Sequence, residues 1–251
     1  MSATDTLVAL FPSVPLRAEP NDRSEMVSQV LAGERIIVLE NLDNNWIKLR
    51  CNLDEYEGYS DSRHFTNYEP FGEDSNVMNV TQALTLVGSD ISVVYPAGTM
   101  ITTSAGVVKI AGRTTDNFNK SSLFNSFTSI SNTAMSFLGV PYLWGGRTFA
   151  GIDCSGLTQM SSRLYDLKPL PRDASDQAKV GHLIGWDDRQ INDLAFFINN
   201  KDEVTHVAIL LSPEEVIHAS GSVRIDKLSS DGIIHSESGE LTHKLHLIKR
   251  I

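Results

Sequence analysis

The chain has 251 residues, of which 41% are hydrophobic and 21% are charged, a composition typical of folded globular proteins rather than disordered ones. Its formal net charge is −10 at pH 7, and no run of Lys and Arg interrupts the acidic balance. These features exclude the basic surface that nucleic acids and anionic membranes require. We expect a folded protein with neither of these partners, and the sequence leaves its oligomeric state open.

The sequence predicts a cytoplasmic location. Its first basic residue is Arg17, and Pro12 and Pro15 interrupt the apolar residues before it, unlike a secretory signal. No stretch reaches the roughly 20 apolar residues of a membrane helix. Two cysteines, Cys51 and Cys154, are too few for a disulfide framework, and a reducing compartment suits a reactive thiol. Cys51 lies in a strand-like stretch and is expected to fill a core.

Residues 1–68 have the pattern of short strands separated by turns, which predicts a small β-barrel. The strand candidates are Val27–Val30, Arg35–Leu39, Trp46–Cys51 and Gly58–Ser60. Residues 69–114 predict a second small barrel, whose candidates are Ala83–Val87, Ile91–Val94, Met100–Thr103 and Val107–Ile110. Residues 115–122 are polar and are expected to form a linker.

Residues 123–251 predict an α+β domain, because a helical pattern comes first and strands follow. Apolar residues recur at helical spacing from Leu123 and Phe124 to Phe137, and Gly139 ends the pattern.

Cys154 lies between an aromatic, glycine-rich loop and a second helical pattern. Apolar residues recur at helical spacing after it, at Leu157, Met160, Leu164 and Leu167. The free amides and the dipole of a helix N-terminus favour a thiolate, which is the nucleophile of cysteine hydrolases. The alternative is a small buried cysteine that only fills the core.

A cysteine nucleophile needs a base, and two histidines lie in adjacent predicted strands. His206 belongs to Val204–Leu211 and His218 to Val216–Ser220, with a turn at Ser212-Pro213-Glu214 between them. An odd number of loop residues places Ala208 opposite His218, so that both imidazoles share one face as diagonal neighbours. We predict this register, and histidines on opposite faces would contradict it.

The other histidines carry weaker signals. His64, His235, His243 and His246 lie in polar or terminal stretches and are expected in solvent, whereas His182, near a loop, is a possible substrate contact. A zinc site of Cys154, His206 and His218 is an open alternative, although no CxxC or HExxH spacing supports it.

Six sequence blocks after residue 125 resemble the NlpC/p60 family of papain-like cysteine peptidases, in the family's order. They are Pro141-Tyr142-Leu143-Trp144-Gly145-Gly146, Asp153-Cys154-Ser155-Gly156-Leu157, Pro171-Arg172-Asp173, Asn192-Asp193-Leu194, Thr205-His206-Val207-Ala208-Ile209 and Ile217-His218-Ala219-Ser220. The family usually has Gly where this chain has Asn192, and Asn tolerates the positive φ that this position favours.

The N-terminal region resembles the bacterial SH3-like domains attached to cell-wall enzymes. The similar residues are Val14-Pro15-Leu16-Arg17, Ser28 to Glu34, Trp46-Ile47-Lys48 and Tyr56-Glu57-Gly58-Tyr59. The whole chain therefore resembles γ-D-glutamyl-L-diamino-acid endopeptidases of the dipeptidyl-peptidase VI type, with two SH3-like β-barrels before a papain-like α+β domain. These enzymes cut murein peptides, and the resemblance implies no metal and no cofactor.

The resemblance also implies roles for individual residues. Cys154 would be the nucleophile, His206 the base and His218 its orienting partner, and Tyr142 would help stabilise the oxyanion with the amide of Cys154. Asp153 and Ser155 would contact the substrate backbone, and Trp144 would line the pocket.

In this family an SH3-like domain can close one end of the cleft and help to bind a free N-terminal amine of substrates that begin with L-Ala. Asp173 matches the family position for this contact, and Tyr59 and Glu25 are candidates from the first barrel. A buried ammonium group must be paired, which is why acids are expected there.

Two other functions stay open on the sequence alone. The chain would be a wall-peptide binding module if its catalytic domain were idle. An amidase or acyltransferase would also fit the same papain-like core. The sequence does not fix the diamino acid, the peptide length, or a role in cell-wall recycling as against attack on foreign wall.

Overall fold

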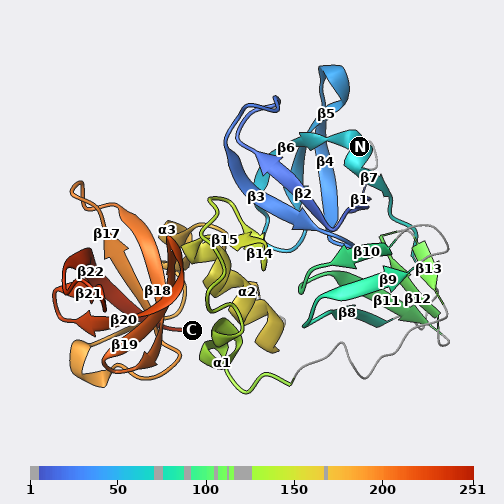
Figure 1. Ribbon diagram of the computed structural model, residues 1–251. Helices are drawn as coiled ribbons and strands as arrows, with labels where there is room; N and C mark the ends of the chain where they lie inside the picture. Colours follow the sequence, from blue (N-terminus) through green and yellow to red (C-terminus); the bar gives the residue numbers. More distant parts are fainter. Residues whose placement is uncertain are drawn as a thin grey trace. The chain divides into compact units, whose positions relative to one another are not determined.

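A computed structural model describes residues 6–70, 76–87, 92–104, 107–111, 113–115, 126–166 and 169–251 of the chain. These residues belong to two compact units, Met1–Ser126 and Phe127–Ile251, and each is considered by itself (Figure 1). Within the described ranges, every helix is too short or too polar to cross a membrane.

The first half of unit 1 is a seven-stranded antiparallel sheet wrapped around one core. The strand order is β3-β2-β6-β5-β4-β1-β7. The strands are β1 (Thr6–Ala9), β2 (Ser13–Arg17), β3 (Met26–Leu31), β4 (Arg35–Asn41), β5 (Trp46–Cys51), β6 (Glu57–Asp61) and β7 (Phe65–Asn67). The four predicted strands correspond to β3–β6, and Cys51 lies in the core as expected. The structure adds strands β1, β2 and β7 to those predicted from the sequence. Strand β2 contains Pro15, and proline argues against a strand in a sequence because it has no amide to donate to the ladder.

The second half of unit 1 has two small sheets around a second core, in the orders β10-β9 and β13-β12-β11-β8. The strands are β8 (Asn76–Asn79), β9 (Leu84–Val87), β10 (Ser92–Tyr95), β11 (Met100–Ser104), β12 (Val107–Ile110) and β13 (Arg113–Thr115). Ala32 of the first half packs into this core, and the Met100 amide donates to its carbonyl over 2.9 Å. The two halves of unit 1 therefore share a packed junction. The predicted strand residue Ile91 lies outside the described residues.

The helix predicted from Leu123 begins later in the structure. Residues 116–125, which include Leu123, Phe124 and nearly all of the predicted linker, lie outside the described residues. Helix α1 spans Ile130–Met135, and the Ser129 hydroxyl accepts a hydrogen bond from the amide of Asn132. This N-cap starts the helix at Ile130, because the extended backbone of a cap residue cannot continue a helix backwards. Phe127, included in the helical pattern, therefore lies before the helix.

Helix α2 (Cys154–Asp166) begins at Cys154, as the sequence predicts. It is buried on nearly every side and packs against two strands of the neighbouring sheet, β18 (Val204–Ser212) and β19 (Glu215–Ser220) (Figure 1). The other short elements of unit 2 are β14 (Arg147–Thr148), β15 (Gly151–Ile152), α3 (Ala174–Gln177) and β16 (His182–Ile184). The β14–β15 pair shapes the loop that leads into Cys154.

The strands after α3 close into a six-stranded barrel. The order is β16-β22-β17-β18-β19-β20-β21, and β21 also pairs with β22. The strands are β17 (Leu194–Ile198), β18 (Val204–Ser212), β19 (Glu215–Ser220), β20 (Ser222–Ser229), β21 (Gly232–Ile234) and β22 (Leu241–Arg250). Side chains such as Phe197, Leu210 and Val216 fill the barrel core.

Two backbone positions with positive φ support this barrel. Asn192 has a φ of 75°, the conformation expected where it replaces the usual glycine. Its side-chain oxygen accepts a hydrogen bond from the amide of Ser131 at 2.9 Å, which ties α1 to the residues before β17. Gly232 has a φ of 144°, and a Cβ there would lie 1.8 Å from the carbonyl oxygen of His243. Glycine therefore permits the close β21–β22 contact beside His243.

Candidate active site

Cys154 is held at the start of α2 by the side chain before it. The carboxylate of Asp153 accepts hydrogen bonds from the amides of Gly145 (2.8 Å) and Gly156 (2.6 Å). The guanidinium of Arg172 donates to both oxygens of the same carboxylate. Asp153 thus joins the aromatic loop, the first turn of α2 and the Arg172 segment into one rigid support for Cys154.

Asp153 and Ser155 are buried and bonded inside the protein. Ser155 Oγ accepts a hydrogen bond from Arg172 at 2.8 Å and lies 3.3 Å from the Asp153 carboxylate. These bonds give both side chains a positioning role. Direct contact with the substrate backbone stays a prediction for them.

Burial favours the neutral form of the Cys154 thiol, against the thiolate expected at a helix N-terminus. Cys154 is only 7% exposed, and burial, with the charge of Asp153, raises the pKa of its thiol to about 12. Hydrogen bonds from the amides of Val207 and Ser155 oppose this rise. Loss of hydration outweighs the helix terminus, because a buried anion forfeits its solvation.

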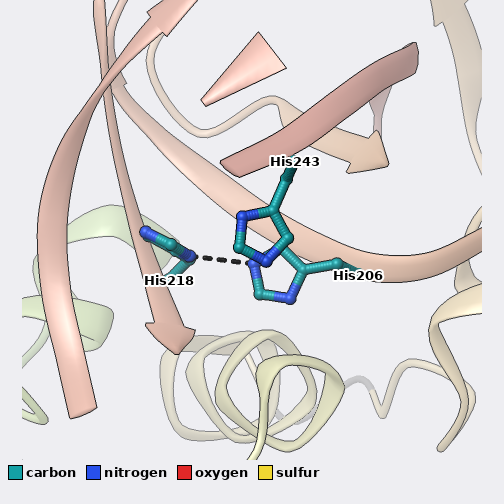
Figure 2. Close-up of side chains that lie close together, drawn as sticks. All are labelled: His206, His218 and His243. Carbon is teal, nitrogen blue, oxygen red and sulfur yellow. Dashed lines mark hydrogen bonds between the residues drawn. The ribbon is translucent and has the colours of Figure 1, made fainter. Parts of the chain in front are cut away.

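His206 and His218 share one face and touch, which confirms the predicted register. Ile209 pairs with Ile217 and Leu210 with Val216, so the next step along the ladder sets Ala208 against His218. His206 Nε2 lies 2.8 Å from His218 Nδ1 (Figure 2). The turn contains the two residues between Ser212 and Glu215, and a bulge after Leu210 supplies the shift attributed to an odd loop.

Asp226 on β20 continues this contact and is absent from the sequence-based site. Its Oδ2 lies 2.9 Å from His218 Nε2 and accepts a hydrogen bond from Arg224 Nε at 2.8 Å. The amide of Ser236 donates to its Oδ1. Burial alone would raise the pKa of Asp226, but the hydrogen bonds from Ser236, His218 and Arg224 lower it to about 2. A buried, ionised acceptor therefore stands at the end of the histidine pair.

Both histidines are neutral near pH 7. Burial lowers the pKa of His206 well below its usual value. Burial also lowers the pKa of His218 to about 4, against the opposing effect of Asp226. The thiol of Cys154 and the imidazole of His206 are thus both favoured in their neutral forms.

His243 on β22 corrects another expectation, since it is half-buried in the site rather than solvated. Its ring stacks on that of His206, with centroids 4.1 Å apart and an angle of 25° between planes (Figure 2). The sequence missed it because the β21–β22 closure brings it there from a distant part of the chain.

The three histidines are the one group, within the described residues, with metal-ligand atoms in mutual reach, all within 4.8 Å. Their geometry fits an ion poorly. A metal lies in the plane of each imidazole that binds it, and the stacked planes of His206 and His243 do not converge on one point. Both nitrogens of His218 already face hydrogen-bond partners. The cluster is better suited to proton transfer than to metal binding.

Tyr142 of the aromatic loop lies near Cys154, and Trp144 belongs to the same loop. The amide of Tyr142 donates to Gly221 O at 2.9 Å, at the turn that follows β19. Burial and then the nearby charge of Cys154 raise the pKa of the Tyr142 phenol, which keeps its hydroxyl protonated. Trp144 is 58% exposed, so its ring is accessible to a ligand.

The remaining predicted residues belong to other elements of unit 2 or to unit 1. Asp173 is half-buried and precedes α3 without capping it through its side chain. Tyr59 and Glu25 lie in unit 1 beside the end of β2, where Tyr59 pairs with Arg17 and the Glu25 carbonyl accepts from Ala18. His182 is exposed on β16.

Comparison with known proteins agrees with this geometry. Residues 139–238 match the NlpC/P60 family, and residues 16–64 match the bacterial dipeptidyl-peptidase SH3 domain. A gamma-D-glutamyl-L-lysine dipeptidyl-peptidase of Bacillus cereus is 35% identical over 113 residues, which cover 43% of this chain and 34% of that protein. The alignment thus spans about a third of that relative.

A second relative and a solved structure extend the match. The probable endopeptidase NlpC of Escherichia coli is 35% identical over 106 residues, 41% of this chain and 68% of that protein. The crystal structure of an NlpC/P60 family protein from Bacillus cereus superposes with a TM-score of 0.77 at 18% identity, covering 98% of this chain and 99% of the other. That likeness shows that the two chains share one fold over nearly their whole length. The chain belongs to the NlpC/P60 family.

Proposed function

We propose that this protein is a cysteine peptidase that hydrolyses the γ-D-glutamyl–diamino-acid bond of murein peptides. The observation that carries the proposal is the hydrogen-bonded series Asp226–His218–His206, because Cys154 bonds to the backbone amide of Val207, the residue next to His206. The name of the Bacillus cereus relative supplies the bond type. We further propose free peptides with an N-terminal L-Ala as substrates, in cytoplasmic cell-wall recycling; Cys51 and Cys154, both free thiols, suit a reducing compartment.

Asp226 sets the protonation of the two histidines. An ionised carboxylate only accepts hydrogen bonds, so the proton of neutral His218 lies on Nε2 and its Nδ1 is an acceptor. His206 must then carry its own proton on Nε2, where it donates to His218. His206 Nδ1 is left as the basic nitrogen, and Figure 2 shows this second nitrogen on the side of α2, the helix that begins at Cys154.

The reaction follows from this arrangement. Cys154 Sγ attacks the γ-carbonyl carbon while its proton passes to His206 Nδ1, since the resting pair is neutral. His206 then gives that proton to the leaving amine of the diamino acid as the C–N bond breaks. Water attacks the thioester, loses a proton to His206, and releases the acid. The same proton returns to Cys154 Sγ.

Two hydrogen-bond donors near Cys154 would stabilise the oxyanion that forms during attack. The amide of Cys154 lies at the N-terminus of α2, and the hydroxyl of Tyr142, which burial keeps protonated, lies near Cys154. Donors fixed before the reaction stabilise the developing charge without reorganisation. The complete series of hydrogen bonds opposes the alternative of an idle binding module. An amidase or acyltransferase reaction differs only in the group that leaves or attacks, and product analysis separates them.

Replacement of the nucleophile tests the reaction. Cys154→Ala should lower release of the diamino acid from L-Ala-γ-D-Glu-diaminopimelate at least about 1,000-fold, because the covalent step is lost. Liquid chromatography with mass spectrometry measures the products. Cys51→Ala, in the core of the first barrel, is the matched control and should keep parental turnover. Equal turnover of C154A and the parent would refute the proposal.

Replacement of Asp226 tests the protonation argument. Both carboxylate oxygens accept from donors, so an amide in Asp226→Asn must set its NH2 against one of them and disturb the His218 tautomer. We expect kcat to fall about 10- to 100-fold with little change in KM. Asp231→Asn, an exposed acid in the following turn, should behave like the parent. A parental kcat for D226N would contradict the role of Asp226.

The free amine is tested with an acetylated substrate. If Asp173 pairs the L-Ala ammonium group, N-acetylation should lower kcat/KM at least about 100-fold, the usual loss when one partner of a desolvated ion pair is removed. Asp173→Asn should raise KM for the free tripeptide. Asp176→Asn should not, because Asp176 already pairs with Lys179 nearby. Equal cleavage of both peptides by the parent would exclude amine recognition.

A further inference from the structure

One ring at the active site has no part in the proton pathway described above. His243 comes from β22, and its ring lies flat against the proposed base His206, with centroids 4.1 Å apart (Figure 2). Phe197 of β17 lies against both rings: its ring centroid is 5.7 Å from that of His206 and 6.1 Å from that of His243. The base is therefore stacked within an aromatic cluster as well as hydrogen-bonded to His218.

We propose that His243 is a positioning residue for the base: its ring holds the plane of His206 and stabilises His206 when it becomes an imidazolium. The inference rests on the proposed role of His206 as the base. The hydrogen bond to His218 fixes one point of the His206 ring, and rotation about that bond stays possible. A ring stacked on its face removes this freedom.

The stacking also has an electrostatic consequence. In the reaction His206 gains a proton in a buried place, where a cation is costly. The electron-rich face of a neutral aromatic ring attracts a cation placed over it. Asp226, the carboxylate of the series, is separated from His206 by the whole ring of His218. The stacked ring thus makes direct contact with the new charge.

This role requires a neutral His243. The charged groups that act on it are Arg224 and Asp226, both from β20, and the rings of His206 and His218 lie against it. Burial and then Arg224 lower the pKa of His243, and Asp226 opposes them. The ring is therefore neutral at pH 7, whereas a second imidazolium would repel that of His206.

Two substitutions distinguish the effect of the aromatic ring of His243 from the effect of its size. His243→Phe keeps a flat ring, and His243→Gln keeps a polar side chain of similar length without one. We expect H243Q to lower kcat about tenfold with KM within about twofold, and H243F to restore most of the lost rate. His246→Ala, at an exposed position of the same strand, is the control and should match the parent.

A second readout does not depend on the substrate. The rate at which iodoacetamide alkylates Cys154 at pH 7 reports how well His206 takes the thiol proton. Peptide mass spectrometry separates Cys154 from Cys51 in this assay. The alkylation rates should follow the order parent, H243F, H243Q. If the alkylation rates follow this order but the parent protein does not cleave murein peptides, the proposed substrate is refuted and the role of His243 is supported.

Two results would overturn the inference: parental kcat and alkylation in H243Q, or an H243F as slow as H243Q. Melting temperatures identify a variant that fails to fold. If H243Q is such a variant, His243→Leu replaces it as the side chain without a ring, and the same outcomes apply.

Discussion

The contact between His218 and the buried carboxylate of Asp226 governs the chemistry of this site. Because Asp226 is ionised and only accepts hydrogen bonds, it fixes the proton of His218 on Nε2, and His218 in turn fixes that of His206. A charge-assisted hydrogen bond is about twice as strong as a neutral one, so the tautomers are set from the Asp226 end. Arg224 and Ser236 hold the carboxylate, and β20 carries both Arg224 and Asp226.

Burial has opposite effects on the two reacting groups. It raises the pKa of the Cys154 thiol and lowers that of His206, which favours a neutral pair until a substrate arrives. A neutral thiol is protected from oxidants, since the thiolate is the reactive form. In the proposed mechanism charge develops only during attack, where the amide of Cys154, the Tyr142 hydroxyl and the ring of His243 would stabilise it.

The local parts of this site could be predicted from the sequence. Helical spacing after Cys154 placed the start of α2, and the Ser212-Pro213-Glu214 turn placed the two histidine strands side by side. The position of Asp226 could also be predicted from the sequence. The tight turn at Gly221 pairs His218 with Arg224, which makes Asp226 a diagonal neighbour of His218. That step extends the hairpin reasoning by one strand.

The non-local parts could not be predicted in this way. His243 reaches His206 only because β22 pairs with both β17 and β21, and such long-range pairings leave no pattern in a single strand. The thiolate expectation failed for a related reason: helix position is visible in the sequence, whereas burial of Cys154 depends on the packing of α2 against β18. Helix α1 begins later than its apolar pattern predicts, because the N-cap Ser129 sets its first residue.

The central claim, that Asp226 orders the protons of the histidine pair, is tested most directly by ¹⁵N nuclear magnetic resonance of the imidazoles at pH 7. Long-range ¹H–¹⁵N spectra distinguish the two neutral tautomers and the imidazolium. The account predicts that His206 and His218 are both neutral and carry their protons on Nε2. A His206 with its proton on Nδ1, or an imidazolium at either position, would contradict it.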